Sequence, residues 1–147
     1  MTKFVLADTG PVYAAVDPDD EHHVRAPREL KRLARDKREV VLAYPALLET
    51  STLVLYRLGK QTASTWSTET MGGAALINPT PEDCNEAASK LAVLADRLIT
   101  LFDATIATLA RRLSAEIWAY DHHFDVMRAS VWRSGIFSRE DNGIPVH

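Results

Sequence analysis

The N-terminal run Phe4-Val5-Leu6-Ala7-Asp8-Thr9-Gly10-Pro11 combines a short apolar segment with an acid and a turn signal. A continuous apolar run that is closed by Gly and Pro predicts a buried strand over residues 3–8. Thr9 or Asp8 can cap a following helix, because Pro11 suits the first helical turn, and this predicts a helix over 10–17. Asp8 is therefore expected at the carboxyl end of a buried strand.

Strand and helix patterns alternate along the rest of the chain. Further buried strands are expected at 39–44, 74–77 and 116–120. Helices are expected at 22–37, 45–58, 60–71, 81–95 and 102–113. The periodicity after about Arg128 is weak and predicts no element. Strands that alternate with helices indicate an α/β fold, with a central, mostly parallel sheet and helices on both faces.

Composition limits the class of protein. The 147 residues fit a single domain over 1–147, and the hydrophobic content of 46% is ordinary for a globular protein. The single cysteine, Cys84, excludes an internal disulfide and points to a reducing, intracellular setting. No apolar stretch is long enough to span a bilayer and no signal peptide is apparent, so a cytoplasmic protein is expected. The net charge of −3 argues against a general basic coat for nucleic acid but leaves room for a local basic face.

Four acids occur in apolar surroundings, namely Asp8, Glu49, Asp103 and Asp121. Asp8 and Asp121 each close a predicted strand, and ligands gather at the carboxyl ends of parallel strands. Asp103 opens the helix at 102–113, and Glu49 lies in a helix that is apolar nearly all round, which predicts a buried helix. Each acid alone has a structural explanation as a cap, a dipole partner or a turn residue. Together they suggest a divalent cation, because burying several unpaired carboxylates is costly.

The chemistry of hard cations agrees with this suggestion. Mg²⁺ and Mn²⁺ prefer carboxylate oxygens supplied by separate elements. Two such ions, roughly 3.5–4 Å apart, can activate a water and stabilise the leaving oxygen of a phosphodiester. Without metal, the same acids would repel one another and raise one another's pKa values.

The order and spacing of these acids resemble those of a PIN-domain ribonuclease, and most closely the VapC-type toxins of bacterial and archaeal toxin–antitoxin pairs. The resemblance covers residues 3 to about 128. Its most specific part is the segment Phe102-Asp103-Ala104-x-Ile106-Ala107, followed by Asp121-x-x-Phe124 eighteen residues after Asp103.

The resemblance implies a PIN-like three-layer α/β/α domain and a metal-dependent endoribonuclease that uses Mg²⁺ or Mn²⁺. It places Asp8, Glu49, Asp103 and Asp121 in the catalytic, metal-binding quartet, Asp125 as an auxiliary metal ligand and Thr9 as a supporting hydroxyl. It also implies an RNA substrate, a homodimer and a cognate antitoxin protein. The sequence departs from the family at Ala119, where a small hydroxyl residue is usual.

Two other functions stay open. The first is a catalytically idle PIN scaffold that binds RNA or a protein partner, for which Ala119 and the low net charge leave room. The second is a metal-dependent nuclease that acts on DNA. A stripe of basic residues could track an RNA backbone, but a solvated helix face paired with nearby acids is favoured; the stripe is Arg25, Arg28, Arg32 and Arg35, and the acids are Glu29, Asp36 and Glu39. The adjacent pairs His22-His23 and His122-His123 lack the ligand spacing of a zinc site.

Overall fold

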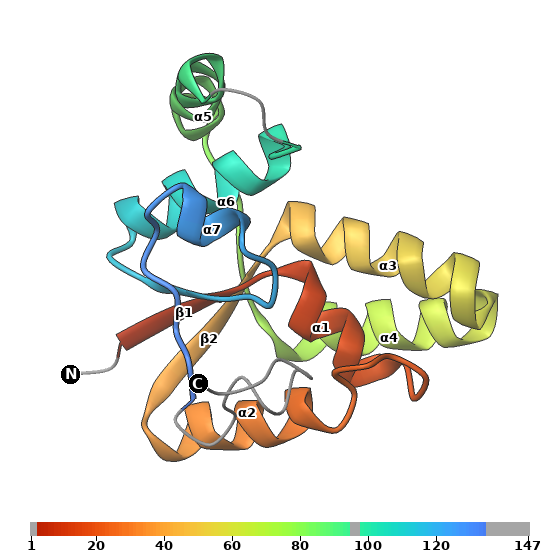
Figure 1. Cartoon of the computed structure of the whole chain (residues 1–147). Coiled ribbons are helices and arrows are strands. Elements are labelled where there is room, and N and C mark those ends of the chain that lie inside the picture. The colour runs from red at the N-terminus through yellow and green to blue at the C-terminus, as the bar shows by residue number, and fades with distance from the viewer. Residues whose placement is uncertain (1–2, 95–97, 135–147) are drawn as a thin grey trace.

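The centre of the molecule is a parallel sheet. The computed structural model describes residues 3–94 and 98–134. Within these ranges the strands are β1 (Lys3–Ala7), β2 (Arg38–Ala43), β3 (Ala75–Ile77) and β4 (Glu116–Trp118), in the spatial order β3-β2-β1-β4. All three strand pairs are parallel, so the carboxyl ends of the strands meet at one edge (Figure 1).

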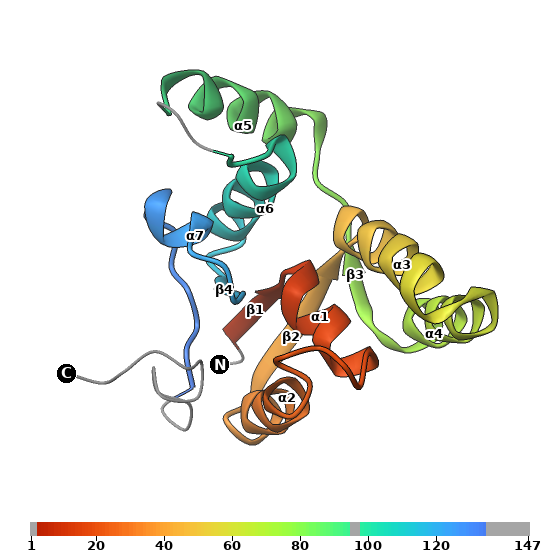
Figure 2. The ribbon, with the colours of Figure 1, turned by 45° about the vertical axis from the view of Figure 1, so that its right-hand side comes forward.

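Helices connect the strands and cover the sheet. They are α1 (Thr9–Val16), α2 (Arg25–Arg35), α3 (Tyr44–Leu58), α4 (Lys60–Gly73), α5 (Pro81–Val93), α6 (Leu101–Arg112) and the short α7 (His123–Val126). The α3–α4 hairpin turns at Gly59, whose φ of 96° is a conformation that side chains with a Cβ rarely adopt. Figure 2 shows this hairpin on the opposite side of the molecule from α5, α6 and α7. No helix in the described ranges is both long and apolar enough to cross a membrane.

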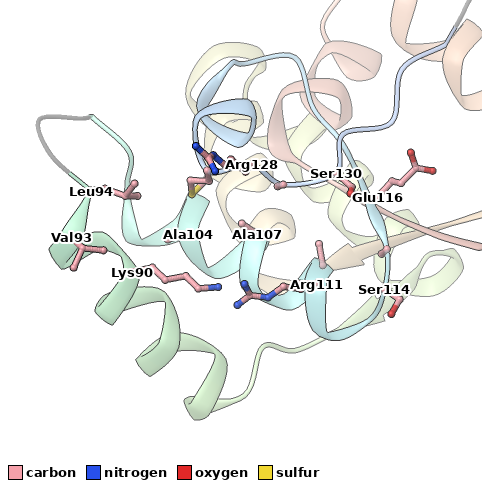
Figure 3. A pocket seen from close by; sticks show the side chains of 14 residues that line it. Lys90, Val93, Leu94, Ala104, Ala107, Arg111, Ser114, Glu116, Arg128 and Ser130 are labelled. Carbon is pink, nitrogen blue, oxygen red and sulfur yellow. The ribbon is translucent and has the colours of Figure 1, made fainter.

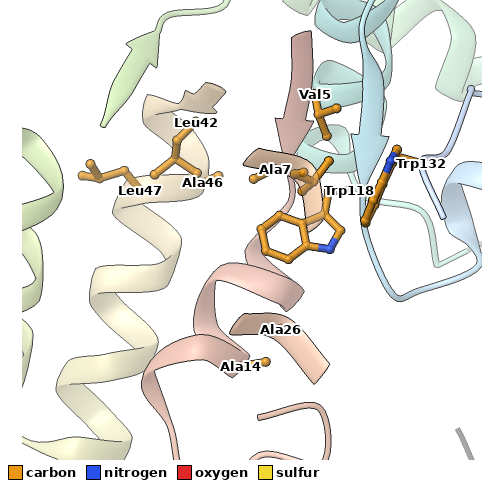
Figure 4. Close-up of a cluster of buried hydrophobic side chains, with 10 residues drawn as sticks. Val5, Ala7, Ala14, Ala26, Leu42, Ala46, Leu47, Trp118 and Trp132 are labelled. Carbon is orange, nitrogen blue, oxygen red and sulfur yellow. The ribbon is translucent and has the colours of Figure 1, made fainter. Parts of the chain in front are cut away.

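Alternating residues of β1 face two separate cores, as the pleat of a strand requires. Val5 and Ala7 belong to a cluster with Trp118 and with residues of α1, α2 and α3 (Figure 4). Leu6, between them, belongs to a second cluster, which α6 and α7 close from the other side. The sheet is thus buried on both faces, and the three-layer α/β/α fold expected from the sequence is confirmed.

The predicted elements agree with the structure to within three residues at each end that the structure describes. The predicted end of a helix at residue 95 lies outside the described residues. The sequence does not predict α7, nor the segment that runs beside β4, where the Ile117 N–H donates to the Ser130 carbonyl at 2.8 Å. Both features depend on contacts with the finished sheet, which local periodicity does not reveal.

The expectation that α3 is buried nearly all round is wrong. Leu48 is 62% exposed and Tyr56 is 81% exposed. The helix packs through Ala46, Thr50 and Val54, which are buried, against α1, α4 and the end of β2. Because α3 touches the sheet only near its own start, the side of the helix that faces away from the sheet, α1 and α4 is left to solvent.

A buried acid and the side chains bonded to it, here called the Glu29 cluster, join α2 to β4. Glu29 is only 1% exposed, so it is not part of a solvated helix face as the sequence suggested. Its Oε1 accepts hydrogen bonds from the Tyr120 hydroxyl at 2.6 Å and from the Trp118 indole N–H at 3.2 Å. The Ser134 hydroxyl donates to Oε2 at 3.2 Å, and Arg25 forms an ion pair with Oε1 at 3.2 Å. The solvated-face expectation does hold for Arg32 and Asp36, which pair at 2.9 Å in an exposed position.

We expect Glu29→Ala to lower the free energy of unfolding by about 3–5 kcal/mol, because it removes a buried acid and leaves the polar groups of Tyr120 and Trp118 without their acceptor. Urea unfolding followed by circular dichroism measures this loss. Glu39→Ala is the matched control, because Glu39 is exposed, and it should change stability by about 0.5 kcal/mol at most. Equal effects of the two substitutions would contradict a structural role for the Glu29 cluster.

Candidate functional site

The carboxyl ends of β1 and β4 bring the first and last acids of the predicted quartet to one edge of the sheet. Ala7 is in register with Trp118, and the Asp8 N–H donates to the Trp118 carbonyl at 2.9 Å. Asp8 follows β1 directly and is 6% exposed, whereas Asp121 lies three residues beyond β4 and is exposed. The pairing of the two strands therefore sets the distance between these acids.

Asp103 is held at the start of α6 by a capping box. Its backbone N–H donates to Thr100 Oγ1 at 3.1 Å, and its carboxylate accepts from the Thr100 N–H at 3.3 Å. This arrangement satisfies two free N–H groups of the first turn and fixes the side chain at the helix N-terminus, where the helix dipole favours an anion. Asp103 is 7% exposed.

Glu49 and Thr9 approach the same edge from α3 and α1. Glu49 lies on the second turn of α3 and is exposed, in contrast with the buried position expected from the sequence. Burial of part of the side chain raises the pKa of the Glu49 carboxyl, the nearby Thr9 hydroxyl lowers it and the charge of Asp103 raises it further. Thr9 itself is buried, and its hydroxyl reaches no partner at full hydrogen-bonding geometry among the described residues.

One hollow of about 410 Å³, here called the acidic hollow, is lined by all four acids of the predicted quartet and by Thr9. The other lining residues include Tyr13, His22, Arg57 and Tyr120, which the sequence does not single out as site residues. They come from loops and helix faces that only the packing of α1, α2 and α3 brings together, so no local motif announces them.

Asp125 does not line this hollow. Its carboxylate is exposed and accepts two hydrogen bonds from Arg133 Nη2, at 2.8 and 2.9 Å. The role of Asp125 as an auxiliary metal ligand stays a prediction, and a bound ion would have to compete with this ion pair.

The acidic hollow holds negative charge at a cost. Burial raises the pKa of Asp8 to about 7, a rise that the Thr9 N–H partly offsets. Repulsion from the carboxylates of Asp121, Asp103 and Glu49 contributes to this raised pKa of about 7. Without a cation, Asp8 therefore holds its proton to a much higher pH than an exposed aspartate does.

The buried donors fit a hard divalent cation. Asp8 Oδ1 is buried and has no hydrogen-bond partner among the described residues, although Asp8 shares the hollow with three other carboxylates. A buried, unpaired carboxylate oxygen is rare in folded proteins because it loses its hydration without compensation. A cation bound to Asp8 and its neighbours would supply the missing partner and remove the repulsion between them.

His123 is a further residue beside the acids that the sequence does not identify as a possible ligand. Its Nδ1 lies 3.0 Å from Asp103 Oδ2 and 3.6 Å from Asp121 Oδ2. One ligand atom from each of these three side chains can be chosen so that all lie within 4.8 Å of one another. Asp121 also accepts the His123 backbone N–H at 2.7 Å. The separation of twenty residues between Asp103 and His123 hides this group from any search for local ligand spacing.

A larger hollow of about 550 Å³ lies on another side of α6, between this helix and α5. It is lined by small apolar residues such as Ala104 and Ala107, with Lys90 and Arg111 at its border (Figure 3). Both cations are engaged by Glu86, at 3.6 Å and 2.6 Å respectively. Because this hollow gathers no group of carboxylates, size alone does not locate the chemistry.

The raised pKa of Asp8 predicts a pH-dependent stability in chelator. Since the folded-state pKa of about 7 lies above the ordinary value of 3.8, this group's contribution is full below about pH 3.8 and is lost as the pH rises through 7. Between pH 6 and pH 8 the loss amounts to about 1 kcal/mol. Urea unfolding of wild type and Asp8→Asn at both pH values isolates the contribution of Asp8 to this loss of stability, because the other titrating groups are common to both proteins. An equal pH dependence in the two proteins would contradict the assignment.

Comparison with known proteins shows which solved structures this fold resembles. The sequence matches no protein-family model and no curated protein. Three of the solved structures that match this chain do so at probability 1.00. VapC20 of Mycobacterium tuberculosis, described as a sarcin-ricin loop cleaving toxin, has a TM-score of 0.76 at 23% identity, covering 88% of this chain and 99% of its own.

The other two matches are more distant in sequence. VapBC2 of Rickettsia felis, bound to a promoter DNA fragment, has a TM-score of 0.68 at 14% identity, over 87% of this chain and 96% of its own. FitAcB of Neisseria gonorrhoeae has a TM-score of 0.64 at 17% identity, over 90% and 97%. At these identities the likeness concerns the backbone. The chain described here therefore has the PIN-like α/β fold of VapC-type toxins.

Proposed function

We propose that this protein is a metal-dependent endoribonuclease that hydrolyses RNA phosphodiester bonds, as the toxin of a toxin–antitoxin pair. The observation that carries the proposal is the buried Asp8, whose Oδ1 has no hydrogen-bond partner among the described residues and which lines one hollow with three further acids at the carboxyl edge of a parallel sheet. The likeness of the fold to VapC20, a sarcin-ricin loop cleaving toxin, supports RNA as the substrate class.

The residues of the hollow divide into two roles. Asp8, Glu49, Asp103 and Asp121 would hold Mg²⁺ or Mn²⁺, and the bound ion would supply Lewis-acid activation of water and neutralise charge on the leaving oxygen. Asp8 and Asp103 are buried and fixed by the sheet and by the α6 capping box, so their positions are set before any ligand binds. Asp121 and Glu49 are exposed, which leaves this side of the hollow open to a substrate.

Arg57 is the cation that lines the acidic hollow. Its guanidinium lies 5.1 Å from the centre of the Tyr13 ring, which holds it at the wall of the hollow. A guanidinium matches the geometry of phosphate oxygens, so Arg57 would orient the RNA backbone against the acids. Ala119 is 3% exposed, packs with Leu6 and Phe124 in the second core cluster and does not line the hollow.

We also propose a cytoplasmic, homodimeric protein whose single domain spans the chain and which binds a cognate antitoxin. The exposed face of the α3–α4 hairpin, with Leu48, Leu55, Tyr56 and Met71, offers apolar area for such contacts. The likeness to the VapBC2 and FitAcB structures supports a toxin–antitoxin assembly.

Asp103→Asn should lower the rate of RNA cleavage by at least about 100-fold while preserving the fold, because the amide oxygen can still accept the Thr100 N–H but carries no charge for a cation. The measurement is cleavage of structured RNAs, including a sarcin-ricin loop oligonucleotide, in Mg²⁺, in Mn²⁺ and in excess chelator. A DNA oligonucleotide of the same sequence tests the choice of RNA over DNA.

Asp36→Asn serves as the control, because Asp36 is an exposed acid that pairs with Arg32 at the end of α2. It should cleave like wild type. Wild-type activity in the Asp103→Asn protein would refute the proposed metal site. A folded wild type that binds RNA or an antitoxin but cuts no RNA would favour the idle scaffold instead.

A further inference from the structure

His123 gives the acidic site a nitrogen donor. Its Nδ1 lies 3.0 Å from Asp103 Oδ2 and 3.6 Å from Asp121 Oδ2, and one ligand atom from each of these three side chains lies within 4.8 Å of the other two. The imidazole is partly enclosed, with 24% of the side chain exposed. The ring is therefore directed at the carboxylates and not at solvent.

The position of His123 follows from two constraints. It is the first residue of α7, and its backbone N–H is fixed by Asp121 Oδ1 at 2.7 Å. The next residue, Phe124, is fully buried in the core beneath α6, which anchors α7 to the sheet. The adjacent His122 is exposed and does not belong to the group of possible ligands. The two histidines therefore differ in role despite being neighbours in the sequence.

A second, independent observation points to a ligand at this place. Asp8 Oδ1 is unpartnered among the described residues, in a side chain that is 6% exposed, and Asp8 lines the same hollow as Asp103 and Asp121. The hydrogen bond between His123 and Asp103 does not reach Asp8. The imidazole therefore leaves the buried oxygen without a partner among the described residues, and a cation bound in the hollow that Asp8 shares with Asp103 and Asp121 would supply one.

We propose that His123 binds the metal through Nδ1, beside Asp103 and Asp121, so that the site prefers a transition-metal ion such as Mn²⁺ to Mg²⁺. This inference rests on the proposed function, because it concerns the same metal site. Mg²⁺ has a strong preference for oxygen ligands and keeps its waters, whereas the affinity of mixed nitrogen and oxygen sites rises from Mn²⁺ along the first transition row. An imidazole nitrogen among carboxylates therefore favours Mn²⁺ over Mg²⁺.

Binding requires the neutral imidazole with its lone pair on Nδ1 and its proton on Nε2. In the absence of metal, the other tautomer can donate Nδ1–H to Asp103 Oδ2 at the observed 3.0 Å. Exchange of this hydrogen bond for a metal bond needs only a change of tautomer, since the nitrogen already lies beside both carboxylates.

The test uses the full-length protein with Mn²⁺ as the probe. Pulsed electron paramagnetic resonance of bound Mn²⁺ detects a directly coordinated imidazole through its nitrogen hyperfine coupling. We expect this coupling in wild type and in His122→Leu, and its loss in His123→Leu. Calorimetry should show Mn²⁺ affinity about 10–100-fold lower in His123→Leu, with Mg²⁺ affinity changed by about twofold at most. Circular dichroism checks that both variants are folded.

The possible outcomes separate this inference from the proposed function. Bound Mn²⁺ without nitrogen coupling in wild type would overturn the role of His123 while leaving the four-acid site intact. The same holds for coupling that persists in His123→Leu or for equal losses of Mn²⁺ and Mg²⁺ affinity. No binding of either ion by folded wild type would instead refute the metal site itself. If His123→Leu fails to fold, a wild-type spectrum without nitrogen coupling still overturns the role of His123, and so does loss of the coupling in His122→Leu.

Discussion

The parallel pairing of β1 with β4 is the constraint on which the site depends. Register places Ala7 beside Trp118, and the Asp8 N–H is bonded to the strand end of β4. Because parallel strands end at the same edge, the residues that follow them are brought together although more than one hundred positions separate them in the chain. The capping box at Thr100 then aims Asp103 at the same edge. Carboxylates that local structure would scatter are thus held near one another by main-chain hydrogen bonds.

Holding these carboxylates close together lowers the stability of the fold, and interactions elsewhere in the fold offset this cost. The raised pKa of Asp8 expresses the cost of burying a carboxyl group near three others. The Glu29 cluster lies on the adjoining side of β4, and its Tyr120 also lines the acidic hollow. There, a buried acid is fully provided with donors, so it joins α2 to β4 instead of repelling its neighbours. Burial and the bond to Glu29 raise the pKa of Tyr120, which keeps this hydroxyl a donor. Glu29 and Asp8 differ because both carboxylate oxygens of Glu29 accept hydrogen bonds, whereas Asp8 Oδ1 has no partner among the described residues.

The four acids differ in their exposure to solvent, and this difference fits the proposed binding of a large substrate. Asp8 and Asp103 are rigid and buried, whereas Asp121 and Glu49 stand at the open side. Arg57 brings positive charge to the wall of the hollow. An enclosed set of four acids would bind a cation as well, but it would exclude a phosphodiester. From α3, Glu49, Leu53 and Arg57 line this hollow.

The sequence by itself determined the order of strands and helices, the parallel sheet and the acids at its edge. These follow from local periodicity and from the position of Asp8 after an apolar run, which are properties of neighbouring residues. Only the tertiary structure decided the exposure of Glu49, the burial of Glu29 and the approach of His123 to Asp103. The physical reason is that exposure and long-range contact depend on which faces of the helices meet. An apolar stripe shows that a helix has a partner, but the packing of α1, α2 and α7 against the sheet decides which side chains share a pocket.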